Sequence, residues 1–181
     1  MNKKHHVYVL LIIFLGTLLR HAAYAKEPLT WAGVRQAIRQ EFPGIPFLST
    51  QQLFEYLSNP DTVKPVLLDA RAPGEYAVSH IQGARNAEKK KDALKILENV
   101  RKDTFIVVYC SVGYRSASLV GDLLAQGYTN VYNLEGSVFE WANEGKPVYN
   151  TGNKQVKSVH PYDQKWGALL KKDLRAPVKK K

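Results

Sequence analysis

Residues 105–116 read Phe-Ile-Val-Val-Tyr-Cys-Ser-Val-Gly-Tyr-Arg-Ser and carry the strongest structural signal in the chain. The first half is an aliphatic and aromatic run, typical of a strand buried on both faces of a parallel sheet. This run ends directly on Cys110, and apolar residues at helical spacing follow from 117 to 125, where Gly127 stops the pattern. A strand, a short loop and a helix in this order indicate an α/β unit.

The same alternation continues in both directions along the chain. Thr30 and Ser49 are predicted N-caps, Ser49 as part of a capping box, and Pro73 stands where another helix would begin. Helices are predicted at 31–41, after Ser49, at 88–99 and at 138–144, and further strands at 66–69 and 131–134. We therefore predict an α/β fold with a parallel central sheet and helices on both faces.

Composition narrows the classes of protein and of site. The chain has 181 residues, of which 45% are hydrophobic, so it can bury a core and is expected to form one main domain. Its single cysteine excludes an intramolecular disulfide framework and any zinc or iron–sulfur site with several cysteines from one chain. We expect no cofactor and no metal.

Residues 1–25 have the layout of a secretory signal. Lys3 and Lys4 precede an apolar stretch from 7 to 19, and Ala23-Tyr24-Ala25 supplies small residues at the cleavage positions. The apolar stretch is shorter than the roughly 20 residues that span a bilayer, which favours a cleaved signal over a retained anchor or a buried helix. We predict cleavage after Ala25 and a periplasmic protein, for which nucleic acid is not an expected partner.

Charge is distributed unevenly over four predicted segments: the signal at 1–25, an N-terminal helical extension at 26–44, the main domain at 45–150 and a basic C-terminal tail at 151–181. Residues 1–25 hold 3 basic and 0 acidic side chains, residues 26–150 hold 14 and 14, and residues 151–181 hold 9 and 2. The formal charge of +10 therefore says little about the main domain.

The tail allows three interpretations. Trp166, Leu169, Leu170 and Leu174 would share one face of a helix. That helix would be a basic amphipathic surface for an anionic membrane or an acidic protein partner. Alternatively, Trp166 packs on its own domain, or the tail is solvated.

The loop after Cys110 has the features of an anion-binding site around a nucleophile. It lies at the carboxyl edge of the sheet, where ligands bind, and the first N–H groups of the next helix are free to cradle an anion. Gly113 permits a positive φ, Ser116 is a candidate helix cap, and Arg115 adds a positive charge that would lower the pKa of the thiol. The candidate cradle consists of Ser111, Val112, Gly113, Tyr114, Arg115 and Ser116. An inert, buried cysteine is the alternative.

Three segments in order resemble the rhodanese-like sulfurtransferase family, from about residue 45 to 148. The first combines Leu-Asp-Ala-Arg at 68–71, Glu75-Tyr76 and His-Ile-Gln-Gly-Ala-Arg-Asn at 80–86. The others are the loop from Cys110 to Ser116 and a closing segment with Asn-Leu-Glu-Gly at 133–136, Trp141, Gly145, Pro147 and Val148. The chain departs from the family at Ser79 and Ser137, where glycine is common.

The resemblance implies that Cys110 takes a sulfane sulfur from an anionic donor such as thiosulfate and passes it, as a persulfide, to a thiol or cyanide. Arg115 would bind the donor. Asp69 and Arg71 would support the site, either directly or through a structural ion pair or a capping role with Glu75. His80 would belong to a turn that positions the chain rather than act as a base.

Two other functions fit the same scaffold. Phosphatases and arsenate reductases with a related loop have one more residue between cysteine and arginine than the four between Cys110 and Arg115. The shorter loop favours sulfur. A non-catalytic binding module is the second alternative. Many such modules are expected to lose the nucleophile, whereas this chain keeps the cysteine, glycine and arginine of the loop together.

Overall fold

A computed structural model describes residues 29–177, so the predicted signal at 1–25 lies outside the described residues. The central sheet has five parallel strands in the order β1-β5-β4-β2-β3. They are β1 (Phe47–Leu48), β2 (Val66–Asp69), β3 (Arg85–Asn86), β4 (Ile106–Tyr109) and β5 (Val131–Leu134). The strands predicted at 66–69 and 131–134 are confirmed, and the strand predicted at 105–109 begins one residue later.

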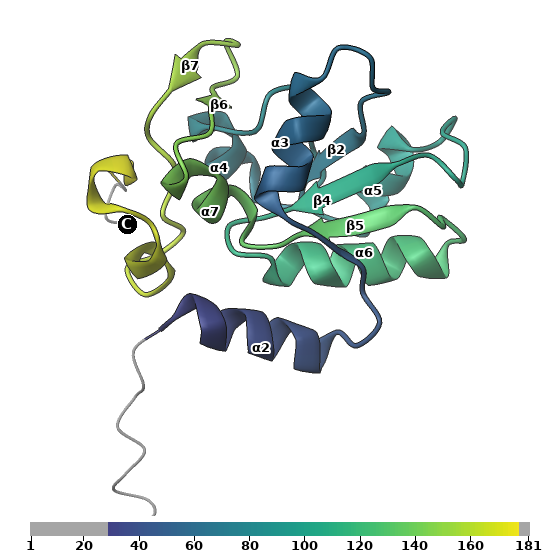
Figure 1. Ribbon diagram of the computed structural model, residues 1–181, viewed down its shortest axis with the longest axis horizontal. Coiled ribbons are helices and arrows are strands. Elements are labelled where there is room, and N and C mark those ends of the chain that lie inside the picture. Colours follow the sequence, from purple (N-terminus) through teal and green to yellow (C-terminus); the bar gives the residue numbers. More distant parts are fainter. Residues whose placement is uncertain (1–28, 178–181) are drawn as a thin grey trace, which may run out of the picture.

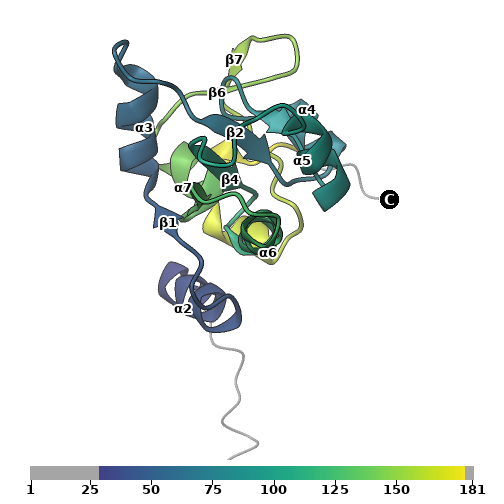
Figure 2. The same ribbon diagram turned by 90° about the vertical axis from the view of Figure 1, so that its right-hand side faces the viewer.

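Helices cover both faces of this sheet, which confirms the predicted fold class (Figures 1 and 2). They are α2 (Trp31–Glu41), α3 (Thr50–Ser58), α4 (Pro73–Val78), α5 (Lys90–Ile96), α6 (Tyr114–Ala125) and α7 (Ser137–Asn143). The buried side chains of α5 and α6 pack on one face, and those of α3 and α7 pack on the other.

The central strand β4 explains this two-sided packing. Its four residues are all fully buried, and successive side chains point to opposite faces of the sheet. Val107 and Tyr109 join the cluster under α3 and α7, whereas Ile106 and Val108 join the cluster under α5 and α6. A strand buried on both faces has no polar side, which is why the sequence shows an uninterrupted apolar run there.

Local signals set the starts of the helices as predicted. Thr30 Oγ1 accepts the N–H of Gly33 at 3.1 Å at the start of α2. Ser49 and Gln52 form a reciprocal capping box at the start of α3, with distances of 3.1 and 2.9 Å. Pro73 occupies the first position of α4.

The N-terminal helix α2 packs on the main domain near the loop after β4. Val34 and Ile38 are buried in the core cluster that α3 and α7 share. Arg35 pairs with Glu140 of α7, and Arg39 lies 2.5 Å from the carboxylate of Glu135. This helix thereby supports the end of the sheet where β4 and β5 terminate.

The C-terminal segment also packs on the domain. Strands β6 (Val148–Tyr149) and β7 (Gln155–Val156) pair in antiparallel fashion across the boundary predicted at residue 150. Beyond them the chain forms two short 3₁₀ helices, η1 (Trp166–Leu169) and η2 (Lys172–Leu174), in place of the amphipathic α-helix considered above. Figure 1 shows this segment in yellow beside α7.

Buried side chains and hydrogen bonds anchor that segment. Leu169 and Leu170 are buried in the core cluster, the side-chain amide of Asn143 donates to the carbonyl of Leu169 at 2.8 Å, and Ala176 N–H donates to the carbonyl of Val159 at 2.9 Å. Of the three interpretations of the tail, the structure has the one in which it packs on its own domain. Within residues 29–177 no helix has the length and apolar character needed to cross a membrane.

The burial of Leu170 predicts that shortening its side chain destabilises the protein. Because its side chain is 1% exposed, Leu170→Ala should lower the free energy of unfolding by about 2–5 kcal/mol. Urea denaturation measures this, with Val63→Ala as control, since Val63 is 90% exposed. Equal stability of the two variants would show that residues 159–176 are not part of the folded core.

Candidate active site

Cys110 lies directly after β4, at the carboxyl edge of the sheet, with α6 beginning four residues later. Its side chain is 1% exposed, and the N–H of Gly113 points at Sγ from 3.2 Å. Gly113 has a φ of 110°, a conformation that strongly favours glycine. A Cβ at this position would also come within 3.3 Å of Ile38. Both constraints hold the loop around the sulfur.

The loop stabilises the thiolate of Cys110. Burial by itself raises the pKa of a thiol, but the charge of Arg115, the hydroxyl and N–H of Ser116 and the N–H of Gly113 together outweigh it. The pKa of Cys110 is therefore lowered. A thiolate at neutral pH is the nucleophilic form, so the arrangement suits covalent chemistry at sulfur.

Ser116 serves the thiolate rather than the helix terminus, so its prediction as a helix cap is wrong. Helix α6 already begins at Tyr114, with Gly113 as the N-cap residue. Ser116 therefore lies in the first turn, and its fully buried hydroxyl has no hydrogen-bond partner within residues 29–177. That leaves the hydroxyl available to the sulfur.

Arg115 is held by a carboxylate. Its two terminal nitrogens each lie 2.8 Å from an oxygen of Glu75, and Nη2 also donates to Ser111 Oγ at 3.0 Å. Burial raises the pKa of Glu75, but the hydrogen bonds and charge of Arg115 outweigh it, so this pKa is lowered and the carboxylate stays ionised. One of the two roles predicted for Asp69 and Arg71 was an ion pair or capping role with Glu75, whereas the structure pairs Glu75 with Arg115 of the Cys110 loop.

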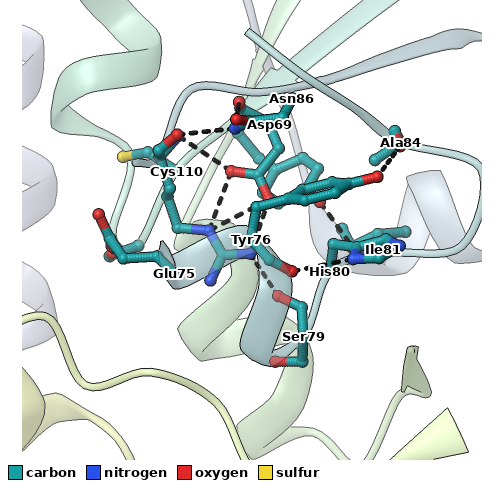
Figure 3. Close-up of polar contacts among 12 residues, drawn as sticks. Asp69, Glu75, Tyr76, Ser79, His80, Ile81, Ala84, Asn86 and Cys110 are labelled. Atoms are coloured by element: carbon teal, nitrogen blue, oxygen red, sulfur yellow. Dashed lines mark hydrogen bonds and ion pairs between the residues drawn. The ribbon is translucent and has the colours of Figure 1, made fainter. Parts of the chain in front are cut away.

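Asp69 and Arg71 form a separate, fully buried ion pair next to the site (Figure 3). Arg71 Nε lies 2.9 Å from one oxygen of Asp69 and Nη2 lies 2.6 Å from the other. Arg71 also donates to the carbonyl of Ser79 at 2.5 Å, and the amide of Asn86 donates to the carbonyls of Asp69 and Arg71. These contacts fix the end of β2 and the chain beyond α4, which is a structural role.

His80 lies in a tightly packed turn. Its ring stacks on Tyr76 with centroids 4.0 Å apart, and Nδ1 lies 3.0 Å from the carbonyl of Tyr76. Its backbone exchanges two hydrogen bonds of 2.8 Å with Tyr149. Figure 3 shows His80 and Cys110 on opposite sides of this group of residues.

The two serines that replace glycine differ in conformation. Ser79 is extended, with a φ of −168° that any residue adopts. Ser137 has a φ of 52°, which is strained for a side chain, and its Oγ accepts the N–H of Cys110 and donates to the carbonyl of Leu134, both at 3.1 Å. Ser137 thus buttresses the backbone of the nucleophile.

A pocket of about 120 Å³ opens beside the thiol. Most of its lining comes from the predicted loop, but two aromatic residues come from the C-terminal segment. The lining residues are Cys110, Ser111, Val112, Tyr114, Arg115, Tyr162 and Trp166. No sequence pattern pointed to Tyr162, and the spacing of Trp166 predicted only a face for a membrane, an acidic partner or its own domain.

Comparison with known proteins agrees with this geometry. The rhodanese-like domain family matches residues 50–144, which include α4, the Cys110 loop and all of α7. The chain belongs to the rhodanese-like domain family. A protein described as a sulfurtransferase from Allochromatium vinosum is 35% identical over 88 residues, which cover 49% of this chain and 81% of that protein.

Other relatives share only part of their length with this rhodanese-like chain. A tRNA uridine(34) hydroxylase from Photorhabdus laumondii is 30% identical over 139 residues, which cover 72% of this chain but only 37% of that protein. Among solved structures, a thiosulfate sulfurtransferase from Pseudomonas aeruginosa matches with a TM-score of 0.56 and 21% identity, covering 74% of this chain and 25% of that one. A rhodanese-like domain from Anabaena matches with a TM-score of 0.53 and 22% identity, covering 64% of this chain and 86% of that one. These two structures support the fold.

The charge of Arg115 predicts how the reactivity of Cys110 in this rhodanese-like site depends on pH. The rate of alkylation of Cys110 by iodoacetamide should rise with pH through a midpoint below about 8.5, because only the thiolate reacts. Arg115→Ala in a Glu75→Gln background removes the cation without leaving an unpaired carboxylate. The midpoint of this double variant should lie about one pH unit above that of the Glu75→Gln variant. Arg101→Ala, at an exposed ion pair, is the control. An unchanged midpoint in the double variant would contradict the role of Arg115.

At Ser137 we expect two substitutions to change the free energy of unfolding by different amounts. Ser137→Ala loses the hydrogen bond to Cys110 N–H and keeps the strained φ, so it should lower the free energy of unfolding by about 1–2 kcal/mol. Ser137→Gly loses the same bond but relieves a backbone strain of about 1–2 kcal/mol, so its stability should stay near that of the parent. Urea denaturation compares them, and equal stabilities would refute this balance.

Proposed function

We propose that the protein is a sulfurtransferase that carries sulfane sulfur from a thiosulfate-like donor to a thiol or cyanide through a persulfide on Cys110. The observation that carries the proposal is the lowered pKa of a thiol that lines an open pocket and is surrounded by N–H donors. Membership of the rhodanese-like family and similarity to a described sulfurtransferase support it.

The first half-reaction loads the enzyme. The Cys110 thiolate attacks the outer sulfur of thiosulfate, a new S–S bond forms to Cys110, and the S–S bond within thiosulfate breaks. Sulfite leaves with the electron pair of that bond, and the persulfide keeps the negative charge. The N–H groups from Ser111 to Ser116 would stabilise both the incoming donor and the persulfide anion.

The second half-reaction unloads it. Cyanide attacks the outer sulfur and leaves as thiocyanate, and Cys110 regains its thiolate. A thiolate acceptor attacks the protonated persulfide in the same manner and leaves with the transferred sulfur and its proton. In the first half-reaction the lowered pKa of Cys110 raises the fraction of thiolate, which attacks without a general base, and in the second the acceptor attacks as an anion.

Arg115 would act mainly on the thiolate. Because Glu75 holds both terminal nitrogens of the guanidinium, little net positive charge remains to attract an anionic donor. Donor recognition would therefore rest chiefly on the backbone cradle, with Arg115 contributing through its charge at short range. This modifies the role in donor binding that the resemblance implies for Arg115.

The proposal includes export. The signal-like residues 1–25, cleavage after Ala25 and a periplasmic site of action are parts of it that rest on the sequence alone. The exposed Lys165, Lys171 and Lys172 would contact an acidic protein partner or an anionic membrane. Buried Leu169 and Leu170 are not available for such contacts.

The hydroxylase activity named for the tRNA uridine(34) relatives is a weaker candidate. Those proteins extend well beyond the matched region, which covers only 37% of the length of the Photorhabdus laumondii protein. Residues 26–150 are formally neutral, with 14 basic and 14 acidic side chains, which gives this domain no excess charge for nucleic acid.

Intact-mass measurement tests the proposed function. After exposure of the protein to thiosulfate, the mass should increase by one sulfur atom, and Cys110→Ser should show no increase. Addition of cyanide should remove the extra mass and release thiocyanate.

The same preparation separates the alternatives. Release of phosphate from an aryl phosphate without a sulfur adduct would indicate a phosphatase, and absence of both reactions would indicate a binding module. Either result would contradict the proposal.

A further inference from the structure

The wall of the pocket opposite the catalytic loop belongs to the C-terminal segment, outside the residues that the family matches. Tyr162 and Trp166 line the pocket with Cys110, and the family match ends at residue 144. The Tyr162 ring lies 4.9 Å from the guanidinium carbon of Arg115, and Tyr162 is 47% exposed. Two aromatic side chains beside a nucleophile, only partly covered, offer surface to a substrate rather than to the core.

The backbone holds this wall in place. Tyr162 has a φ of 65°, a conformation that costs a non-glycine residue energy, and its N–H donates to His160 Nδ1 at 3.0 Å. Trp166 N–H donates to Asp163 at 2.7 Å, and Gly167 approaches Pro161 so closely that a Cβ would lie 2.8 Å from the proline ring. Strain of this kind concentrates at functional sites, and the tight turn keeps both rings at the pocket.

The pocket carries little net charge. Arg115 is paired with Glu75, and burial lowers the pKa of nearby His160, which keeps the imidazole neutral at neutral pH. Lys165 is exposed, with Nζ 5.6 Å from the centroid of the Trp166 ring, and it is not among the residues that line the pocket. The surface that a substrate meets is therefore chiefly aromatic and aliphatic.

The size of the pocket limits the substrate group. Its volume is about 120 Å³, and an enclosed apolar cavity of about 150 Å³ holds one benzene molecule. Since this pocket is open to solvent, one ring or a short branched alkyl group fits, with any polar remainder outside. Cyanide or sulfite would leave most of the aromatic surface uncovered.

We propose that Tyr162 and Trp166 select the sulfur acceptor, and that the acceptor is a thiol carried on an apolar group about the size of one aromatic ring. This proposal rests on the sulfur transfer proposed above. The acceptor thiolate attacks the outer sulfur of the protonated Cys110 persulfide, the new S–S bond forms to the acceptor, and the bond to Cys110 breaks with its electron pair returning to Cys110. The acceptor leaves as a persulfide that retains the proton.

The experiment compares acceptors on a preloaded enzyme. Cys110 of the full chain is loaded with inorganic polysulfide, loading is verified by intact mass, and discharge is followed with phenylmethanethiol, 2-mercaptoethanol and cyanide. Rate constants for the two thiols are expressed per concentration of thiolate. In the parent protein phenylmethanethiol should react about tenfold faster than 2-mercaptoethanol, a difference of about 1.4 kcal/mol, because the two alkyl thiolates have similar intrinsic nucleophilicity and differ chiefly in the aromatic ring.

Variants assign this preference to the two rings. Trp166→Ala and Tyr162→Ala should each reduce the ratio of the phenylmethanethiol to the 2-mercaptoethanol rate constant about fivefold or more, while Trp166→Phe and Tyr162→Phe should retain most of it. Tyr56→Ala, at a tyrosine 42% exposed on α3 and absent from the pocket lining, should leave the ratio unchanged. Because Tyr162 is largely exposed, its variant keeps the test readable if Trp166→Ala does not fold.

A ratio near one in the parent, or a ratio that neither alanine variant changes, would overturn the proposal. Failure of sulfur transfer gives a different result. In that case thiosulfate does not load Cys110, whereas the polysulfide-loaded protein still reports the acceptor preference.

Discussion

The buried charges at the carboxyl edge of the sheet must be paired for the chain to fold around Cys110. Two arginines lie there, one of them fully buried, and an unpaired buried guanidinium would cost several kcal/mol. Asp69 pairs with Arg71 and Glu75 pairs with Arg115, so each cation has its own carboxylate. The second pair joins α4 to the start of α6 and thereby fixes the Cys110 loop against a different part of the chain.

This pairing determines how the site handles anions. Arg115 is close enough to lower the pKa of Cys110, yet Glu75 cancels most of its charge at longer range. Affinity for the proposed anionic donor would therefore come from N–H groups near the sulfur, such as that of Gly113 at 3.2 Å. The formal charge of +10 does not contribute to this affinity. Residues 26–150 are formally neutral, and the excess of basic side chains lies at 1–25 and 151–181.

The sequence predicts those parts of the molecule that local chemistry determines. The buried strands at 66–69 and 131–134, the caps at Thr30 and Ser49 and the position of Cys110 at the sheet edge all follow from short patterns. Edge strands β1 and β3 have two residues each, too few for any periodicity to be visible. The pairing of Glu75 with Arg115 spans 40 residues and depends on how α4 and α6 pack, so no local pattern could reveal it.

The C-terminal segment shows why a correct pattern can give an incomplete function. Trp166, Leu169 and Leu170 have a spacing that suits one face of an α-helix, but the chain places them on a 3₁₀ turn and the residue after it. There the leucines are buried in the core, and Trp166 turns toward a cysteine 56 positions earlier in the chain. Cys110 and its N–H donors belong to the family region at 50–144, while two of the three aromatic residues that line the pocket, Tyr162 and Trp166, come from beyond it. Chains that share this catalytic loop can therefore differ in their acceptors, since the side chains that would contact the acceptor lie in a segment with separate packing constraints.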